Sequence, residues 1–254
     1  MCTVVVSVAP GSAWPVVFLG LRDEVADRPW DAPAAWWPEL GDRVEGVRDR
    51  EAGGAWLATA TAPARASVVL NRREEPAPPA GGWTTRGALP LSAAASGALP
   101  GGRPTTRAFN LLAADADGAR VASWDGAGLT TETLAPGVHV LTHGSTDDLD
   151  VPRVARWLPR FRGVEAPTGP PTGPAGASTG PDDGDRGRWE PWLALLREST
   201  ELPADHDEAL VRADLLDGRW FGSLSLSLVA VSAGQVRHEH HRLDRASPLV
   251  GHFA

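Results

Sequence analysis

A single cysteine stands at position 2 of this 254-residue chain, where its backbone nitrogen matters as much as its thiol. A small residue after Met1 normally permits removal of the initiator, which would leave Cys2 with a free α-amine. Such an amine titrates at about 7.7–8.0 in model compounds, close enough to neutral pH to act as a base. A thiolate is also a strong nucleophile at this pH. Cys2 is therefore predicted to carry nucleophile and base in one residue.

The first two predicted strands, Thr3–Val8 and Pro15–Leu21, would bring two charged side chains beside this thiol. Opposed residues of an antiparallel hairpin have numbers with a constant sum, here roughly 23 to 24. Cys2 is then expected opposite the last residue of the second strand or opposite Arg22. Arg22 would lower the thiol pKa or hold an anionic group, and Asp23 would orient the ammonium that forms after proton capture. A solvated strand end is the plainer alternative.

The composition excludes several classes of function. The formal net charge of −8 opposes binding to a nucleic-acid backbone. The sequence contains no Lys, which excludes Schiff-base enzymes and P-loop NTPases. One Cys cannot form an internal disulfide, so a reducing compartment is expected. The N-terminal segment lacks a cationic region and is interrupted by Pro10 and Pro15, so we expect a soluble cytoplasmic protein without a membrane span.

Short β-branched runs separated by turns predict antiparallel hairpins, and a few helical patterns accompany them. The further strand pairs are Ala55–Thr61 with Ser67–Asn71, Ala108–Ala114 with Arg120–Trp124, Leu129–Leu134 with Val138–Thr142, and Ser223–Val231 with Gln235–Arg242. The helix candidates are Val151–Arg162, Trp189–Glu198 and Asp207–Leu216. This pattern favours an α+β fold, an antiparallel sheet covered by helices. We expect one domain over residues 1–254, with the Pro/Gly-rich residues 163–188 as a disordered surface insertion.

Six short segments carry a resemblance to one family. They are Met1-Cys2-Thr3, Leu21-Arg22-Asp23-Glu24, Gly53-Gly54-Ala55-Trp56-Leu57-Ala58, Val69-Leu70-Asn71-Arg72, Thr85-Arg86-Gly87 and Phe109-Asn110-Leu111. Jointly and in this order, they resemble the signature of the NRDE family, also called the transport and Golgi organisation protein 2 family. The resemblance extends from residue 1 to about residue 155.

The NRDE family in turn resembles the N-terminal nucleophile hydrolases of the penicillin V acylase and bile-salt hydrolase type. That resemblance implies an αββα sandwich, with two antiparallel sheets packed face to face between helix layers. It implies that Cys2 attacks the carbonyl carbon of a linear amide or related acyl bond and forms an acyl-enzyme. Asn71 would donate a hydrogen bond to the oxyanion, a contact typically worth about 10²–10³ in rate. His143, Arg86 and Trp56 are the expected substrate contacts, with no metal or cofactor.

Three positions depart from the family pattern. Leu21 replaces an Asn, His143 stands where many relatives have an Asn, and Leu224 stands where a substrate-binding Arg is usual. The competing hypothesis is therefore a non-catalytic binding or trafficking protein for a small molecule. Haem is one such ligand, and Cys2 or His143 would be its axial ligand in an apolar pocket. A third hypothesis is an interaction partner of enzymes encoded beside it.

Other polar clusters have simpler interpretations than a site. Alternation along a strand puts His238 and His240 on one face and His241 on the other, which indicates a solvated strand rather than a zinc site. Asp205-His206-Asp207-Glu208 is typical of a helix start. The Trp-rich residues Trp30–Pro38 would either line a hydrophobic pocket or pack in the core.

Overall fold

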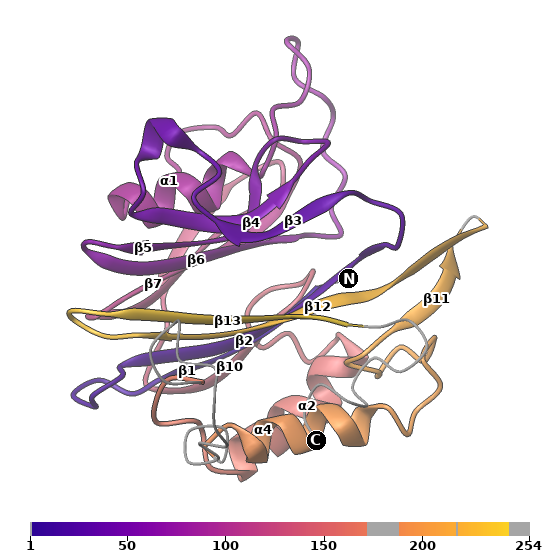
Figure 1. Ribbon diagram of the computed structural model, residues 1–254. Helices are drawn as coiled ribbons and strands as arrows, with labels where there is room; N and C mark the ends of the chain where they lie inside the picture. Colours follow the sequence, from indigo (N-terminus) through magenta and orange to yellow (C-terminus); the bar gives the residue numbers. More distant parts are fainter. Residues whose placement is uncertain (1, 172–187, 217, 244–254) are drawn as a thin grey trace.

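The computed structural model describes residues 2–171, 188–216 and 218–243. These residues form two antiparallel sheets and three α-helices, so the predicted α+β class is confirmed. In Figure 1, α1 covers the outer face of one sheet, the two sheets face each other, and α2 and α4 cover the outer face of the second sheet.

The second sheet positions the N-terminus. Its strand order is β10-β1-β2-β12-β11, and β13 also pairs with β12. The strands are β1 (Thr3–Val8), β2 (Val16–Val25), β10 (Gly137–Leu141), β11 (Ala213–Leu216), β12 (Arg219–Val231) and β13 (Val236–Arg242). Every residue of β1 is buried because both faces of the strand are covered. Val4 and Val6 face the other sheet, while Val5 packs against the helices.

The other sheet is a meander of neighbouring strands in sequence order, β3 to β9. They are β3 (Trp30–Ala34), β4 (Val44–Asp49), β5 (Ala55–Thr61), β6 (Ala64–Asn71), β7 (Phe109–Asp115), β8 (Gly118–Trp124) and β9 (Leu129–Thr133). A 3-10 turn, η1 (Pro38–Leu40), lies between β3 and β4. The sequence did not predict β3 or β4. Trp30 and Ala34 lie in the first of them, whereas Trp37 is buried against β4 and β5.

Two helices on the second sheet follow the predicted pattern closely. The helix α2 (Pro152–Gly163) contains Pro159, and its buried residues Val154, Trp157 and Phe161 recur at helical spacing. The helix α4 (Glu190–Ser199) buries Trp192 and its leucines in the same core cluster. By contrast, α1 (Ala88–Ser96) was not predicted, because its small apolar residues give no amphipathic pattern.

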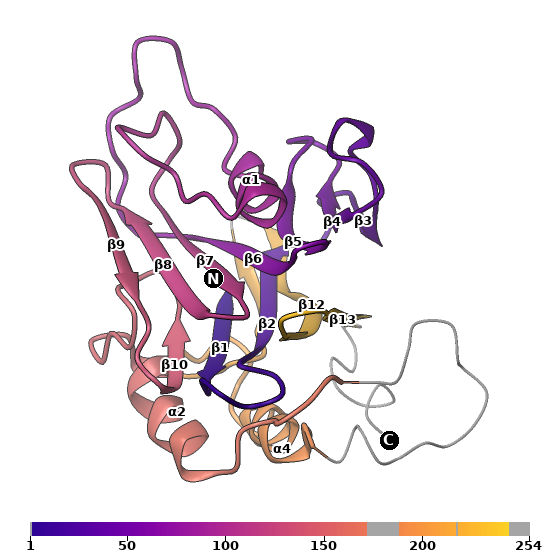
Figure 2. The same cartoon turned by 90° about the vertical axis from the view of Figure 1, so that its left-hand side faces the viewer.

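The predicted hairpin between Leu129–Leu134 and Val138–Thr142 is wrong. Figure 2 shows β9 and β10 in different sheets, since β9 pairs with β8 and β10 pairs with β1. The Pro-Gly signal between them marks a crossover in which Gly137 takes a φ of 131°, a conformation that favours glycine. In the β5–β6 hairpin the turn is also tighter than expected, because Ala64 already belongs to β6.

The predicted helix over Asp207–Leu216 is also wrong, and so is the helix start at Asp205–Glu208. Those residues form turns, in which the amide of Ala209 donates to the carbonyl of His206 at 2.9 Å. The chain then enters β11, whose backbone pairs with β12. Strand pairing outweighs the helical spacing of the apolar residues here.

Most of the predicted insertion at residues 163–188 lies outside the described residues. Within the part that the structure describes, no helix is both long and apolar enough to cross a membrane.

Candidate active site

The first hairpin has the register expected from its turn. Thr3 pairs with Leu21, so Cys2 follows in register opposite Arg22. The Cys2 thiol donates a hydrogen bond to the carbonyl oxygen of Asp23, with a sulfur–oxygen distance of 3.6 Å. The two strands therefore bring together the thiol and both charged residues that the sequence singled out.

A β-bulge in β12 shapes the other side of this corner. Ser223 pairs with Asp23 and Ser225 pairs with Arg22, so Leu224 is the extra residue of the bulged strand. The hydroxyl of Ser223 donates to Oδ1 of Asp23 at 2.6 Å. Bulges re-aim side chains and are frequent beside functional sites. The departure at Leu224 thus falls on a bulge that holds Asp23 in place.

A buried arginine from α2 completes the surroundings of Asp23. Nη1 of Arg153 lies 3.5 Å from Oδ2 of Asp23, and both side chains are almost fully buried. The same nitrogen donates to the hydroxyl of Thr3 at 2.9 Å. Burial lowers the pKa of Arg153, and the charge of Asp23 opposes that shift. Truncating one partner of such a pair is strongly destabilising.

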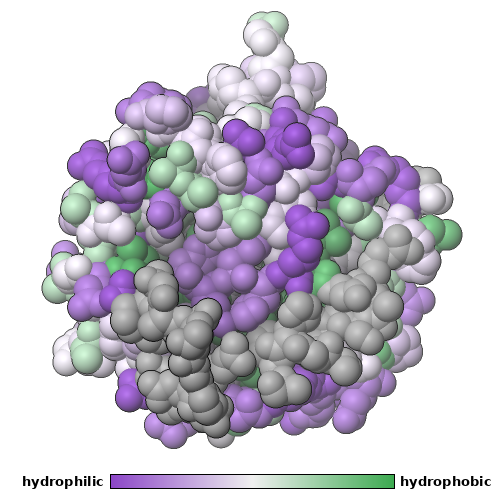
Figure 3. Space-filling model, viewed as in Figure 1, coloured by the Kyte–Doolittle hydropathy of each residue, from purple (hydrophilic) through white to green (hydrophobic). Residues whose placement is uncertain are grey.

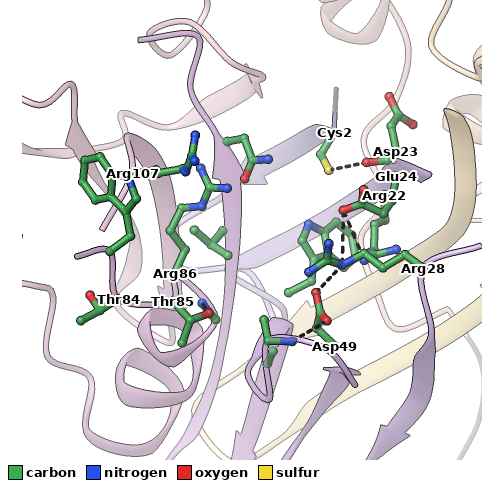
Figure 4. A pocket seen from close by; sticks show the side chains of 17 residues that line it. Cys2, Arg22, Asp23, Glu24, Arg28, Asp49, Thr84, Thr85, Arg86 and Arg107 are labelled. Atoms are coloured by element: carbon green, nitrogen blue, oxygen red, sulfur yellow. Dashed lines mark hydrogen bonds and ion pairs between the residues drawn. The ribbon is translucent and has the colours of Figure 1, made fainter. Parts of the chain in front are cut away.

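Cys2, Arg22 and Asp23 line a pocket of about 520 Å³, shown in Figure 4. Its walls come from β2, from β4 to β6, and from the segments on either side of α1. The lining residues are Cys2, Arg22, Asp23, Glu24, Arg28, Asp49, Ala52, Ala55, Trp56, Val69, Asn71, Trp83, Thr84, Thr85, Arg86, Gly87 and Arg107.

The surroundings of the Cys2 thiol favour its protonated form. Burial raises the pKa of the Cys2 thiol above the usual value for cysteine, and the negative charge of Asp23 raises it further. Arg22 has the opposite, smaller effect on the same pKa. A nucleophilic role therefore requires a base that removes the proton during attack, because the thiolate does not form in advance.

Ion pairs organise the wall next to the thiol. Glu24 lies 3.7 Å from Nη2 of Arg22 and 3.9 Å from Nε of Arg28. Nε of Arg28 also donates to Asp49 at 2.7 Å. Each carboxylate on this wall therefore faces a guanidinium.

The motif at residues 53–58 and the motif at residues 85–87 pack directly on each other at the pocket wall. A Cβ added to Gly54 would lie 2.5 Å from the backbone of Gly87, so the two backbone segments are in direct contact at these glycines. The amide of Ala55 donates to the carbonyl of Gly87 at 2.9 Å. This contact fixes Arg86, the residue before Gly87, at the pocket wall. Trp56 lines the pocket too.

The motif Phe109-Asn110-Leu111 links the two sheets. Asn110 of β7 donates to the carbonyls of Thr142 at 3.0 Å and Gly144 at 2.6 Å, just after β10. His143 between them does not line the pocket that contains Cys2. Burial and the charge of Arg73 lower the pKa of His143. His143, expected as a substrate contact, is therefore not among the residues that line the pocket together with Cys2.

Of the residues assigned by resemblance, Asn71 does reach the pocket. It ends β6, where it pairs with Phe109 of β7, and it lines the same cavity as Cys2. Leu224 does not line this pocket, although its neighbour Ser223 holds Asp23.

The histidines of β13 are half-buried and not fully solvated as expected. His238 and His240 share one face, as predicted, and Ser227 lies 3.1 Å from Nε2 of His238 and 2.9 Å from Nδ1 of His240. Both rings are only partly exposed, and burial lowers the pKa values to about 4 and about 3 respectively. Figure 3 shows hydrophilic side chains across the middle of the face along which β13 runs. Among the described residues, no three His, Cys, Asp or Glu side chains gather as metal ligands.

Residues 1–164 match the family model described as Transport and Golgi organisation 2. The match covers more than half of the chain. The chain belongs to the Transport and Golgi organisation 2 family. No curated protein matches it.

The Transport and Golgi organisation 2 match includes the Cys2 hairpin and every motif from which the resemblance was inferred. It ends beside the last residues of α2, so it includes Arg153. It does not include β12, although Ser223 of that strand holds Asp23. The site of this family member is thus completed by a strand that the family model does not cover.

Sequence reasoning missed Arg153, Ser223, Arg28 and Arg107. The sequence held one signal for Arg153. It is a charged residue on the otherwise apolar, buried face of the predicted helix, next to Val154. No local pattern in the sequence relates Arg28 or Arg107 to Cys2.

Proposed function

We propose that this chain is an N-terminal cysteine hydrolase that cleaves a linear amide or related acyl bond after removal of Met1. The observation that carries the proposal is that Cys2 lines a pocket of about 520 Å³ together with Arg22, Asp23 and Asn71. Two facing antiparallel sheets between helices also agree with the architecture of N-terminal nucleophile hydrolases.

In the proposed reaction, the free α-amine of Cys2 takes the thiol proton while sulfur attacks the carbonyl carbon. The tetrahedral oxyanion accepts a hydrogen bond from Asn71. Its collapse breaks the carbon–nitrogen bond, and the ammonium returns the proton to the departing amine. The amine then deprotonates a water molecule that attacks the thioester, which releases a carboxylic acid and restores the thiol.

Because burial raises the pKa of the Cys2 thiol, the proposed attack requires a base, and the proposal gives that role to the α-amine of the same residue. An amine that titrates near pH 8 would deprotonate the thiol only as the new bond forms. The side chain of Asp23 is held by Ser223 and Arg153, and its charge acts on Cys2, whose α-amine would become the ammonium. That charge would stabilise the ammonium.

The test separates the thiol from the amine. Inserting one Gly between Met1 and Cys2 keeps the thiol but moves the free amine to the new residue. Turnover of a panel of p-nitroanilides should be lost both in this variant and in Cys2→Ala, while Cys2 of the inserted variant still reacts with iodoacetamide. Unchanged turnover after the insertion would exclude the amine as the base.

The competing proposal is a non-catalytic small-molecule binding or trafficking protein, which the raised thiol pKa and the family description favour. It predicts binding without turnover in the same panel. Haem fits this pocket less well than a polar ligand, because seven of its seventeen lining residues are charged and His143 is not among them.

A further inference from the structure

The pocket has a second charged wall, which faces Cys2 across the cavity in Figure 4. It carries Arg86 and Arg107, and neither forms an ion pair with a carboxylate of the described residues. Nη1 of Arg86 donates to the carbonyl of Ala108 at 3.0 Å. The guanidinium of Arg107 lies 5.8 Å from the ring centre of Trp83.

On the wall beside the thiol, in contrast, an arginine forms ion pairs with carboxylates. There, Arg28 is within ion-pair distance of Glu24, Asp49 and Glu51. The whole chain carries a formal charge of −8, so a pocket wall with two arginines and no ion pair between them and the described carboxylates is unusual for its composition.

The two cations also act on each other. Burial lowers the pKa of Arg86, and the nearby positive charge of Arg107 lowers it further. Figure 4 shows both side chains pointing into the space that faces Cys2. Guanidinium groups remain protonated at neutral pH, so this repulsion persists until an anion lies between them. Arginine pairs bind carboxylate and phosphate oxygens well because their planar donors match those groups.

The backbone holds Arg86 firmly. It precedes Gly87, which touches Gly54 too closely for any side chain there. Arg107 precedes Ala108, which is fully buried at the start of β7. Both guanidinium groups therefore extend from fixed points, which reduces the entropy lost when a ligand binds.

We propose that Arg86 and Arg107 form a cradle for an anionic group of the substrate, a carboxylate or a phosphate-type oxyanion, while its acyl bond faces Cys2. The inference names a substrate class for the proposed hydrolase and rests on that function for the reaction at Cys2. Binding of the anion requires neither the α-amine nor catalysis.

Three alkylating probes of similar size test the cradle. They are the chloroacetamides of propylamine, β-alanine and 2-aminoethylphosphonate, which are neutral, carboxylate-bearing and phosphonate-bearing. Each forms a carbon–sulfur bond with the thiolate and releases chloride, and intact mass reports the rate without ambiguity because Cys2 is the only cysteine. At least one anionic probe should react about tenfold to hundredfold faster than the neutral probe, as expected for charge-assisted hydrogen bonds. The faster anion identifies the type of group.

The variants assign this preference to the two arginines. Arg86→Gln with Arg107→Gln should bring the anionic-to-neutral ratio close to one, whereas Arg86→Lys should keep part of it. The matched control is Arg103→Gln, which removes one charge from a nearby arginine that does not line this pocket. A preference that survives in the double variant, or one that Arg103→Gln removes equally, would contradict the cradle.

A second measurement needs no reaction at Cys2. Glutarate or 2-aminoethylphosphonate should raise the Tm of the wild-type chain but not that of the double variant. If neither anion does so and all three probes react equally, the cradle is excluded while the hydrolase proposal stands. If the Gly-inserted chain still hydrolyses amides, the hydrolase mechanism fails while an observed anion preference remains.

Discussion

Asn110 offers a sharp test of how the two sheets are held together around the pocket. Its side chain is 1% exposed and forms four hydrogen bonds. It donates to the carbonyls of Thr142 and Gly144, and it accepts from Nη1 of Arg72 at 2.9 Å and the hydroxyl of Ser123 at 2.7 Å. Replacement by Leu keeps the volume but removes all four bonds.

The expected loss follows from these bonds. Each contributes about 1 kcal/mol net, and Gly144 keeps one partner because Nη1 of Arg72 also donates to its carbonyl at 3.0 Å. Asn110→Leu should therefore lower the free energy of unfolding by about 3 kcal/mol. Ser123→Ala removes only one of the bonds and should cost about 1 kcal/mol.

Urea unfolding of the three chains, followed by tryptophan fluorescence, measures both losses at constant m. The slope should not change, because the unfolded chains expose similar surface. A loss for Asn110→Leu no larger than that for Ser123→Ala would refute the view that Asn110 links the sheets.

Three further predictions follow from single contacts. Gly54→Ala should destabilise the fold by about 1–3 kcal/mol and slow alkylation of Cys2, because the new methyl group would meet the backbone of Gly87; an unchanged urea midpoint would contradict that contact. The hydrogen bond to Asp147 raises the pKa of His139 above 6.5, so its stabilisation is complete below that pH and is lost as pH rises through the raised value. His139→Gln should thus lower the urea midpoint at pH 6 much more than at pH 9, and an equal loss at both would be inconsistent with the pair. In the chain that retains Met1, the rate of Cys2 alkylation by iodoacetamide should rise with pH and reach its midpoint above pH 9.0, since burial raises the thiol pKa. A midpoint below pH 8 would instead show an activated thiolate.

The N-terminal half of the site could be predicted because its determinants are local. Two continuous apolar runs joined by a short turn set the register of β1 and β2, and that register places Cys2 opposite Arg22. The motif around Asn71 likewise ends a strand that the sequence predicted.

The remaining parts depend on distant pairing. Asp23 is held by Arg153 and Ser223, which lie on elements far along the chain. No regular spacing in the sequence relates Arg153 or Ser223 to Asp23. The crossover before Gly137 has the same turn signal as a hairpin, and only the competition between strand partners decides which sheet β10 joins. The helix α1 has no charged face, so its apolar residues gave no period to detect.

The central claim is that the thiol and the α-amine of Cys2 act together on an acyl group. Time-resolved intact-mass spectrometry of the purified chain with an activated acyl ester tests it most directly. We expect a chain without Met1 that gains one acyl group at Cys2 and then loses it with turnover. Cys2→Ala should gain none, and the Gly-inserted chain should retain its adduct. A purified chain that keeps Met1, or an adduct on Cys2 that decays equally in the Gly-inserted chain, would contradict the claim.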